Sequence, residues 1–293
     1  MYSQIRTSML DGICTMPVQV EVDISMGMPV FDMVGYLSPE VREAKERVRT
    51  ALHNCGILLP AKRITVNLSP ANIRKTGTGF DLPIAVALLV AMGLVKPEKC
   101  VDTIFSGELN LSGQLLPVRG VLPMVSDGVK EGIHKFVVPA DNLMESRLVQ
   151  GADVCGFCAL ESVIGYLQDG GYKEPAYAGR RQNRSHGMPD FSEVNGQQFL
   201  KRAAEIAASG MHNMLMVGPP GAGKTMISER MATILPPLTK KEQLEVSKIY
   251  SVCGLLADSR TLLQERPFRS PHHTVSMAGL AGGGRSIRPG EIS

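Results

Sequence analysis

One short run constrains the fold of this 293-residue chain more than any other feature. It has the pattern G-x-x-x-x-G-K-T and comprises Gly218, Pro219, Pro220, Gly221, Ala222, Gly223, Lys224 and Thr225. Glycines allow a loop to curl so that its backbone N–H groups converge on phosphate oxygens, and a helix that starts after the loop adds its positive end. A lysine and a threonine at these positions are typical of a P-loop that binds ATP with Mg²⁺.

The flanking residues give this loop the context that the motif requires. Met214–Val217 is apolar and predicts a short buried strand, whereas Met226–Ile234 contains good helix formers and precedes the breaker Pro236-Pro237. We therefore expect an α/β P-loop fold in which Lys224 contacts the β- and γ-phosphates and Thr225 is a ligand of the Mg²⁺ ion. A glycine-rich turn without a ligand is the alternative.

Hydrolysis of ATP needs further groups, above all an acidic pair at the end of a neighbouring strand. After Thr225 the nearest candidate is Leu255-Leu256-Ala257-Asp258, which is short and preceded by Gly254. The catalytic residues are therefore unknown from this sequence. With roughly 100 residues where about twice as many are usual, the P-loop domain is expected to be incomplete.

Residues 1–168 predict a separate α+β domain. Val18–Ile24 alternates like a half-buried strand, and Pro29–Gly35 is its expected hairpin partner. Ser38-Pro39-Glu40 has the form of a helix start, and this helix is expected to end near Gly56. Its apolar face comprises Val41, Ala44, Val48, Ala51 and Leu52. Further strands are expected at Ile64–Leu68, Thr103–Leu109, Gln114–Val118 and Lys135–Pro139, and further helices at Leu82–Leu94 and Met124–Glu131.

Residues 169–189 have the composition of a linker, and residues 190–293 follow as the P-loop part. The linker carries the basic run Arg180-Arg181-Gln182-Asn183-Arg184, which either contacts DNA phosphates or is simply solvated. After the linker, a helix is expected with Phe199, Ala203, Ile206 and Ala207 on its apolar side.

Composition excludes several classes of protein. The net charge of +3 is too small to indicate nucleic acid binding by itself, and no apolar stretch is long enough for a transmembrane helix. The lone C-x-x-C pair, Cys155 and Cys158, lacks the second pair of a zinc site, so incidental thiols are favoured over metal or redox chemistry. We expect a cytoplasmic protein with no membrane partner.

Three segments resemble the magnesium-chelatase-like AAA+ proteins of the YifB/ComM type. They are His212–Val217 with the P-loop, Phe268–Thr274 with its His-His pair, and Gly283–Ser293. The N-terminal half is similar to the Lon-protease-like domain of that family, so the expected fold is an α+β Lon-like domain followed by an incomplete α/β P-loop (AAA+) domain. The resemblance implies an ATPase that uses ATP and Mg²⁺, binds DNA, assembles as a homo-hexamer when complete and drives branch migration. It also places Gln197 near the adenine.

The resemblance also bears on proteolysis. Lon proteases use a serine nucleophile and a lysine base. By alignment with that family, Asp81 stands in the place of the serine and Leu122 in the place of the lysine. A carboxylate and an aliphatic side chain cannot form that dyad, so we expect a scaffold or DNA-facing module that does not cleave proteins.

Four functions stay open on these grounds. An ATP-driven DNA remodelling motor leads, and a chelatase-type ATPase that remodels a protein partner is the second. ATP-dependent proteolysis is the third, and a chain that binds nucleotide without turnover is the fourth. His272 and His273 lack a third metal ligand at helical spacing, and nearby Arg269, Arg285 and Arg288 suit a loop that meets nucleic acid or a neighbouring subunit, or an exposed loop without a partner.

Overall fold

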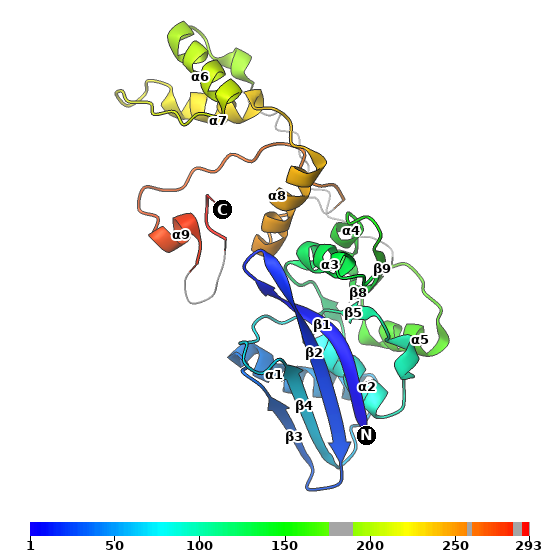
Figure 1. Cartoon of the computed structure of the whole chain (residues 1–293). Coiled ribbons are helices and arrows are strands. Elements are labelled where there is room, and N and C mark those ends of the chain that lie inside the picture. The colour runs from blue at the N-terminus through cyan, green and yellow to red at the C-terminus, as the bar shows by residue number, and fades with distance from the viewer. Residues whose placement is uncertain (176–189, 257–259, 284–288, 293) are drawn as a thin grey trace.

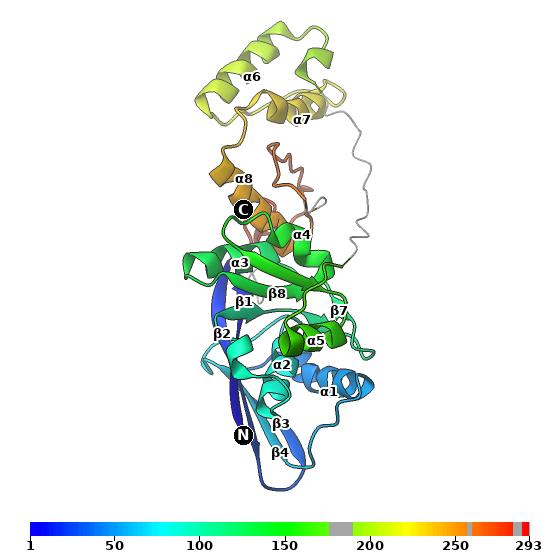
Figure 2. The same ribbon diagram turned by 90° about the vertical axis from the view of Figure 1, so that its right-hand side faces the viewer.

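A seven-stranded mixed sheet organises the N-terminal half of this α/β protein (Figures 1 and 2). The computed structural model describes residues 1–175, 190–256, 260–283 and 289–292. The strand order is β3-β4-β2-β1-β5-β8-β9. The bounds of these strands are Tyr2–Asp11 (β1), Cys14–Ser25 (β2), Val30–Val34 (β3), Arg63–Ser69 (β4), Thr103–Phe105 (β5), Lys135–Pro139 (β8) and Asp153–Phe157 (β9). A separate two-stranded sheet joins β6 (Glu108–Leu109) and β7 (Leu115–Leu116).

Helices cover this sheet and also form the upper part of the molecule in Figure 1. The α-helices are Pro39–Asn54 (α1), Asp81–Ala91 (α2), Val121–Lys130 (α3), Leu143–Ser146 (α4), Leu160–Asp169 (α5), Gln198–Gly210 (α6), Lys224–Ile234 (α7), Lys240–Cys253 (α8) and Met277–Ala281 (α9). Short 3₁₀ turns occur at Pro97–Lys99 (η1), Ala140–Asn142 (η2) and Phe191–Glu193 (η3). Within the described residues, no helix is long and apolar enough to cross a membrane.

The core of the N-terminal half forms where α2 packs on β1 and β2. The two strands pair antiparallel from Tyr2↔Asp23 to Asp11↔Cys14. Alternate strand residues such as Ile5 and Val20 are buried, as the period of two requires. Every residue of α2 is buried, which is the burial expected for a helix that is apolar on all sides.

The sequence predicted several elements close to their observed bounds. Helix α1 begins at Pro39 with Ser38 as N-cap residue, and all five residues of its predicted apolar face are buried. Strands β2, β4 and β8 coincide with predicted strands, and α2, α3 and α7 with predicted helices. Strand β9 and helix α5 were not predicted.

The predicted hairpin between Val18–Ile24 and Pro29–Gly35 is wrong. Strand β3 pairs with β4 instead, in parallel, with Phe31 opposite Ile64. Both edges of β2 are already occupied, by β1 on one side and β4 on the other. Since a strand has only two edges for hydrogen bonding, β3 is excluded from β2.

The predicted strand Thr103–Leu109 is also divided, because β5 and β6 belong to different sheets. The chain changes direction at Ser106-Gly107, where Ser106 N–H donates to Val137 O at 3.0 Å and Gly107 N–H to Gly79 O at 3.1 Å. A Cβ atom on Gly107 would lie 2.9 Å from a Leu115 methyl, so this crossing needs a residue without a side chain.

The predicted strand Met214–Val217 has no strand conformation in the structure. Leu215 is 88% and Val217 89% exposed, so the segment is not buried either. A strand is stabilised by hydrogen bonds to a neighbouring strand. No described strand pairs with this segment, so its apolar side chains have no sheet to pack in.

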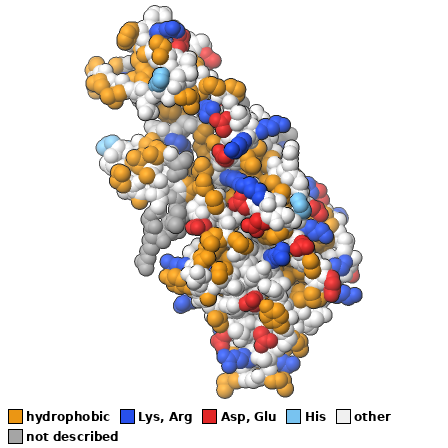
Figure 3. Space-filling model, viewed as in Figure 1, with side chains coloured by type: hydrophobic (Ala, Val, Ile, Leu, Met, Phe, Trp, Pro, Cys, Tyr) orange, Lys and Arg blue, Asp and Glu red, His pale blue; other side chains and the backbone are white. Residues whose placement is uncertain are grey.

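Helix α6 buries only part of the predicted apolar face, because Ala207 is buried and Ala203 is half-buried, whereas the two large residues of that face are exposed. Phe199 is 89% and Ile206 52% exposed, whereas Ala204, Ala207 and Ala208 are buried. Figure 3 shows hydrophobic side chains gathered on the end of the molecule that α6 and α7 form. The residues of α6 that are buried are therefore small alanines.

A buried ion pair joins α1 to α2. Asp81, at 0% exposure, receives two hydrogen bonds from Arg47, at 2.7 and 2.9 Å, and a third from Leu109 N–H at 3.0 Å. Burial raises the pKa of the Asp81 carboxyl, and the bonds from Arg47 and Leu109 oppose that rise. Arg47 also donates to Glu40 O within α1, and the Asp81 carboxylate that it holds accepts from β6, so the ion pair joins α1, α2 and β6.

We predict that Arg47→Ala lowers the free energy of unfolding by about 3–5 kcal/mol, because it leaves the Asp81 carboxylate buried without its cation. Urea denaturation measures this change. Glu43→Ala removes an exposed partner of the same arginine and should cost less than about 1 kcal/mol. Equal effects of the two substitutions would contradict a structural role for the buried pair.

Candidate functional site: the phosphate loop

The P-loop lies at the N-terminus of α7. The helix begins at Lys224, and its N-cap residue Gly223 adopts the left-handed conformation at φ 80° without any side chain capping the first turn. Gly221 is also left-handed, at φ 79°. Two such glycines bend the loop around the free first-turn N–H groups, which is the arrangement that receives an anion.

The side chains of the loop fit a phosphate and its metal ion. The Lys224 ammonium folds back over the loop and donates to Gly218 O at 2.8 Å and to Pro219 O at 2.6 Å. The Thr225 residue is exposed on the first turn of α7, where its hydroxyl is accessible to a ligand. The predicted residues from Gly218 to Thr225 thus form one continuous segment at the start of α7, exposed except at the half-buried Ala222, Gly223 and Lys224.

Gln197 lies apart from this loop in the described hydrogen-bond network. It is the exposed N-cap residue of α6, at φ 53°, and its carbonyl accepts from Lys201 N–H at 2.9 Å. No hydrogen bond among the described residues joins Gln197 to the P-loop. Its proximity to adenine stays a prediction that follows from the family resemblance.

An ion pair fixes α7 to the segment that precedes α6. The Arg230 guanidinium contacts the Glu193 carboxylate of η3. A capping box between Asp190 and Glu193 holds this turn, with Asp190 N–H donating to the Glu193 carboxylate at 3.3 Å, and the Asp190 side chain also accepts from Ser192 N–H at 2.7 Å. No local sequence pattern marks this contact, since Glu193 and Arg230 are 37 positions apart.

Several other candidate residues lie outside the described part of the chain. These are Asp258, the basic residues Arg180, Arg181, Arg184, Arg285 and Arg288, and the polar residues Gln182 and Asn183. The acidic candidate for hydrolysis and most of the basic candidates for DNA contact are therefore not placed.

The His-His segment forms a small local network. The rings of His272 and His273 lie 4.1 Å apart, and His272 Nδ1 is 2.7 Å from the Thr274 hydroxyl. Arg269 donates to the Glu291 carboxylate at 2.7 Å. Across the described ranges, no cluster of three or more His, Cys, Asp or Glu side chains is arranged to hold a metal ion.

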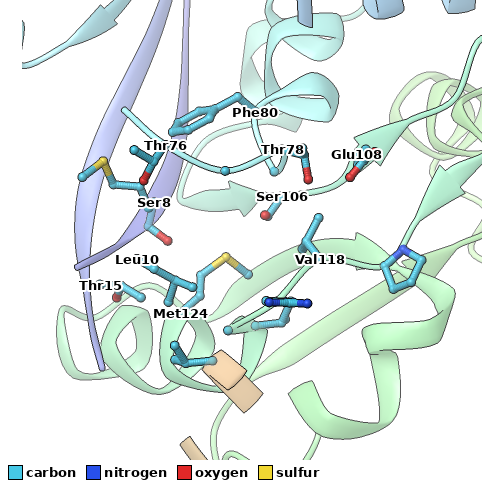
Figure 4. Close-up of a pocket in the computed structure, with 18 of the residues that line it drawn as sticks. Ser8, Leu10, Thr15, Thr76, Thr78, Phe80, Ser106, Glu108, Val118 and Met124 are labelled. Carbon is cyan, nitrogen blue, oxygen red and sulfur yellow. The ribbon is translucent and has the colours of Figure 1, made fainter. Parts of the chain in front are cut away.

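The N-terminal half contains a cavity of about 500 Å³ that the sequence did not predict (Figure 4). It opens where β1 and β5 end and is lined by residues from β1, the loop before α2 and the start of α3. The hydroxyls of Ser8, Thr78 and Ser106 point into it, and Val118 and Met124 form an apolar side. The cavity thus combines hydroxyl groups with an apolar wall.

Comparison with known proteins covers most of the chain. Residues 190–293 match the family described as magnesium chelatase, subunit ChlI, and residues 20–142 match the family described as subunit ChlI of Mg-chelatase. The chain is 40% identical over 291 residues to uncharacterized protein YifB of Escherichia coli, which covers 99% of this chain and 57% of that protein. It is 39% identical over 293 residues to competence protein ComM of Haemophilus influenzae, with 98% and 57% covered.

A weaker similarity links part of the chain to a protease. The chain is 27% identical over 135 residues to Lon protease 1 of Sorangium cellulosum, which covers 43% of this chain and 16% of that protein. With 57% of the YifB and ComM relatives covered, the chain spans little more than half of their length.

We predict that Gly223→Ala weakens ATP–Mg²⁺ binding about tenfold. An alanine in the left-handed region costs about 1–2 kcal/mol, and 1.4 kcal/mol is a factor of ten in affinity. Isothermal titration measures the change. The control is Gly165→Ala in α5, where the added methyl meets nothing within 4 Å and φ is not left-handed. Unchanged affinity in Gly223→Ala would contradict the described loop conformation.

Proposed function

Because the chain belongs to the YifB/ComM-type magnesium-chelatase-like proteins, we propose that it is the nucleotide-binding part of an AAA+ ATPase. The observation that carries this proposal is the P-loop at the uncapped N-terminus of α7. Loop and helix together present backbone N–H groups, an ammonium and a hydroxyl at one exposed place. This combination is suited to a polyphosphate with a divalent cation.

Each residue of the loop has a proposed role in binding. Backbone N–H groups around Gly221 and Gly223 receive the phosphate oxygens, and Lys224 leaves its two carbonyl partners to contact the β- and γ-phosphates. Thr225 holds the Mg²⁺ ion. The bound Mg²⁺–ATP supplies the phosphoanhydride bond whose hydrolysis drives a motor. Gln197 is proposed to lie near the adenine.

Hydrolysis and mechanical work are proposed for the longer protein. The resemblance to the YifB/ComM family implies an ATP-driven DNA remodelling motor, active in branch migration and assembled as a homo-hexamer. The name of the ComM relative connects it to competence. Arg269 and the basic residues around it are the proposed DNA-facing or subunit-facing loop.

The N-terminal half is proposed to be a Lon-like scaffold without protease activity. Asp81, in the place of the nucleophile, is held by Arg47, and Leu122, in the place of the base, is buried and aliphatic. Lys75 is no substitute base, because it is fully buried and its ammonium donates to the carbonyls of Pro70 and Ile73. The side chains at these positions therefore cannot form a nucleophile–base pair.

A chelatase-type ATPase that remodels a protein partner is the second candidate. It is favoured by the matches to the magnesium chelatase subunit family over both halves of the chain. This function and the DNA motor share the P-loop and differ in what the ATPase acts on.

We predict that ATP–Mg²⁺ raises the melting temperature of the chain, since ligand at 100 times its dissociation constant adds about 2.7 kcal/mol of stability. Lys224→Ala should remove this shift, because it removes the cation that contacts the phosphates. Lys241→Ala, which changes an exposed lysine of α8, is the matched control and should keep the shift. Absence of a shift in the unsubstituted chain would overturn nucleotide binding.

We predict that the full-length protein hydrolyses ATP faster in the presence of DNA and binds DNA with a strong salt dependence, because phosphate contacts release counterions. Turnover with and without branched DNA, at two salt concentrations, measures this. Capture of a protein partner together with no response to DNA would favour the chelatase-type function instead.

A further inference from the structure

Helix α8 follows the P-loop helix in the chain but packs on the N-terminal half. It lies beside α3, with Leu244 against the hydrophobic cluster that contains Leu122 and Val125 (Figure 1). Lys248 donates to the Asp127 carboxylate of α3 at 3.0 Å. One helix therefore contacts the N-terminal half directly and is joined by a short connection to the C-terminal end of α7, whose N-terminus carries the P-loop.

A buried chain of hydrogen bonds continues from the end of α8 into the N-terminal half. Ser251 Oγ donates to the Glu145 carboxylate at 2.8 Å, and Asn142 Nδ2 donates to the other oxygen at 2.6 Å. Asn142 Oδ1 in turn accepts from Val118 N–H at 2.9 Å. In addition, Gly120 N–H donates to Ser251 O at 3.2 Å. Ser251 is thus linked to the 118–120 segment by two separate routes.

The burial of Glu145 raises the free-energy cost of losing its hydrogen bond to Ser251. The residue is only 7% exposed, so its carboxylate depends on Asn142 and Ser251 for hydrogen bonds. Loss of the serine hydroxyl would leave one oxygen buried without a donor, which is far more costly than loss of a solvated bond. The position of α8 is therefore set by a polar contact with a defined geometry as well as by apolar packing.

The end of α8 also forms part of the cavity wall. Val252 and Cys253 line the cavity together with Val118, Arg119 and Gly120. The last three belong to the segment that Ser251 and Asn142 hold. A displacement of α8 would therefore change the shape of the cavity and also break the hydrogen bonds that hold residues 118–120 in the cavity wall.

At its N-terminal end, α8 is held by hydrogen bonds to the segment that joins it to α7. Thr239 caps the helix in a capping box with Glu242. Arg266 donates to Pro236 O at 2.8 Å and lies 3.4 Å from the Glu242 carboxylate. These bonds tie the residues between α7 and α8 to the start of α8, so a movement of α7 is passed to α8.

We propose that α8 couples nucleotide binding at the P-loop to the cavity of the N-terminal half, with the Ser251–Glu145 and Lys248–Asp127 contacts as the points of coupling. This inference rests on the proposed nucleotide binding. Coupling between two sites is reciprocal in binding free energy, so weakening the contacts of α8 must change the affinity for ATP–Mg²⁺. Neither contact lies in the P-loop, and a purely structural role would leave that affinity unchanged.

The test measures the dissociation constant for ATP–Mg²⁺ by isothermal titration in the full 293-residue chain. Ser251→Ala and Lys248→Ala should each change it by about fivefold or more, in the same direction. Glu145→Gln should leave it unchanged, because the amide oxygen still accepts from Asn142 and the amide nitrogen donates to the Ser251 hydroxyl, which turns to accept. Ser209→Ala and Lys241→Ala make the same truncations on residues that contact neither Glu145 nor Asp127, and they serve as controls.

Hydrogen exchange provides a second measurement on the same proteins. ATP–Mg²⁺ should change exchange over residues 117–121 in the unsubstituted chain, and Ser251→Ala should abolish that change while protection of β1 and β2 persists and reports a folded N-terminal half. Unaltered dissociation constants in both Ser251→Ala and Lys248→Ala, with ATP bound by all variants, would overturn the coupling and leave the proposed function intact. Absence of ATP binding in the unsubstituted chain would overturn both.

Discussion

The Asp81–Arg47 ion pair fixes the position from which the rest of the N-terminal half is arranged. Asp81 opens the fully buried helix α2, Arg47 belongs to α1, and the third bond comes from the backbone at β6. Because a carboxylate without partners is not tolerated at 0% exposure, these three elements have to meet in one geometry. That geometry places α2 under β1 and β2, and it leaves the cavity between the loop before α2 and the start of α3.

The two halves of the chain differ in how their apolar sequence is used. In the N-terminal half, every residue of α2 is buried, and β1 and β2, which pair with each other, bury alternate residues. In the P-loop half, Leu215, Val217 and Phe199 are nearly fully exposed. The first half has a complete hydrophobic core, whereas the second half has the nucleotide loop and its helix without a described sheet beneath them.

Whether a feature could be predicted from the sequence depended on how far apart along the chain its interacting residues lie. The start of α1 was predicted because it depends on residues a few positions apart, although the Ser38 side chain makes no capping bond. The glycine pattern before α7 is equally local, and its role in phosphate binding stays a prediction. The partner of β3 and the division at Ser106-Gly107 depend on contacts with distant segments, and both predictions were wrong. Met214–Val217 has the composition of a strand, but composition does not supply a neighbouring strand. Ser251 and Glu145 are 106 positions apart, and no local pattern marks them as partners.

Lys224 has a consequence for the energetics of the nucleotide site. Its ammonium already makes two short hydrogen bonds to the loop's own carbonyls, Gly218 O and Pro219 O. A phosphate that enters therefore replaces existing ligands of the lysine instead of meeting a cation solvated only by water. The net gain in binding free energy is the difference between a charge–charge contact and a charge–dipole contact. The affinity of the loop for any anion is therefore lower than it would be if the lysine had no carbonyl partners. In return, the two carbonyl bonds hold the lysine in place at the proposed nucleotide site before a phosphate enters.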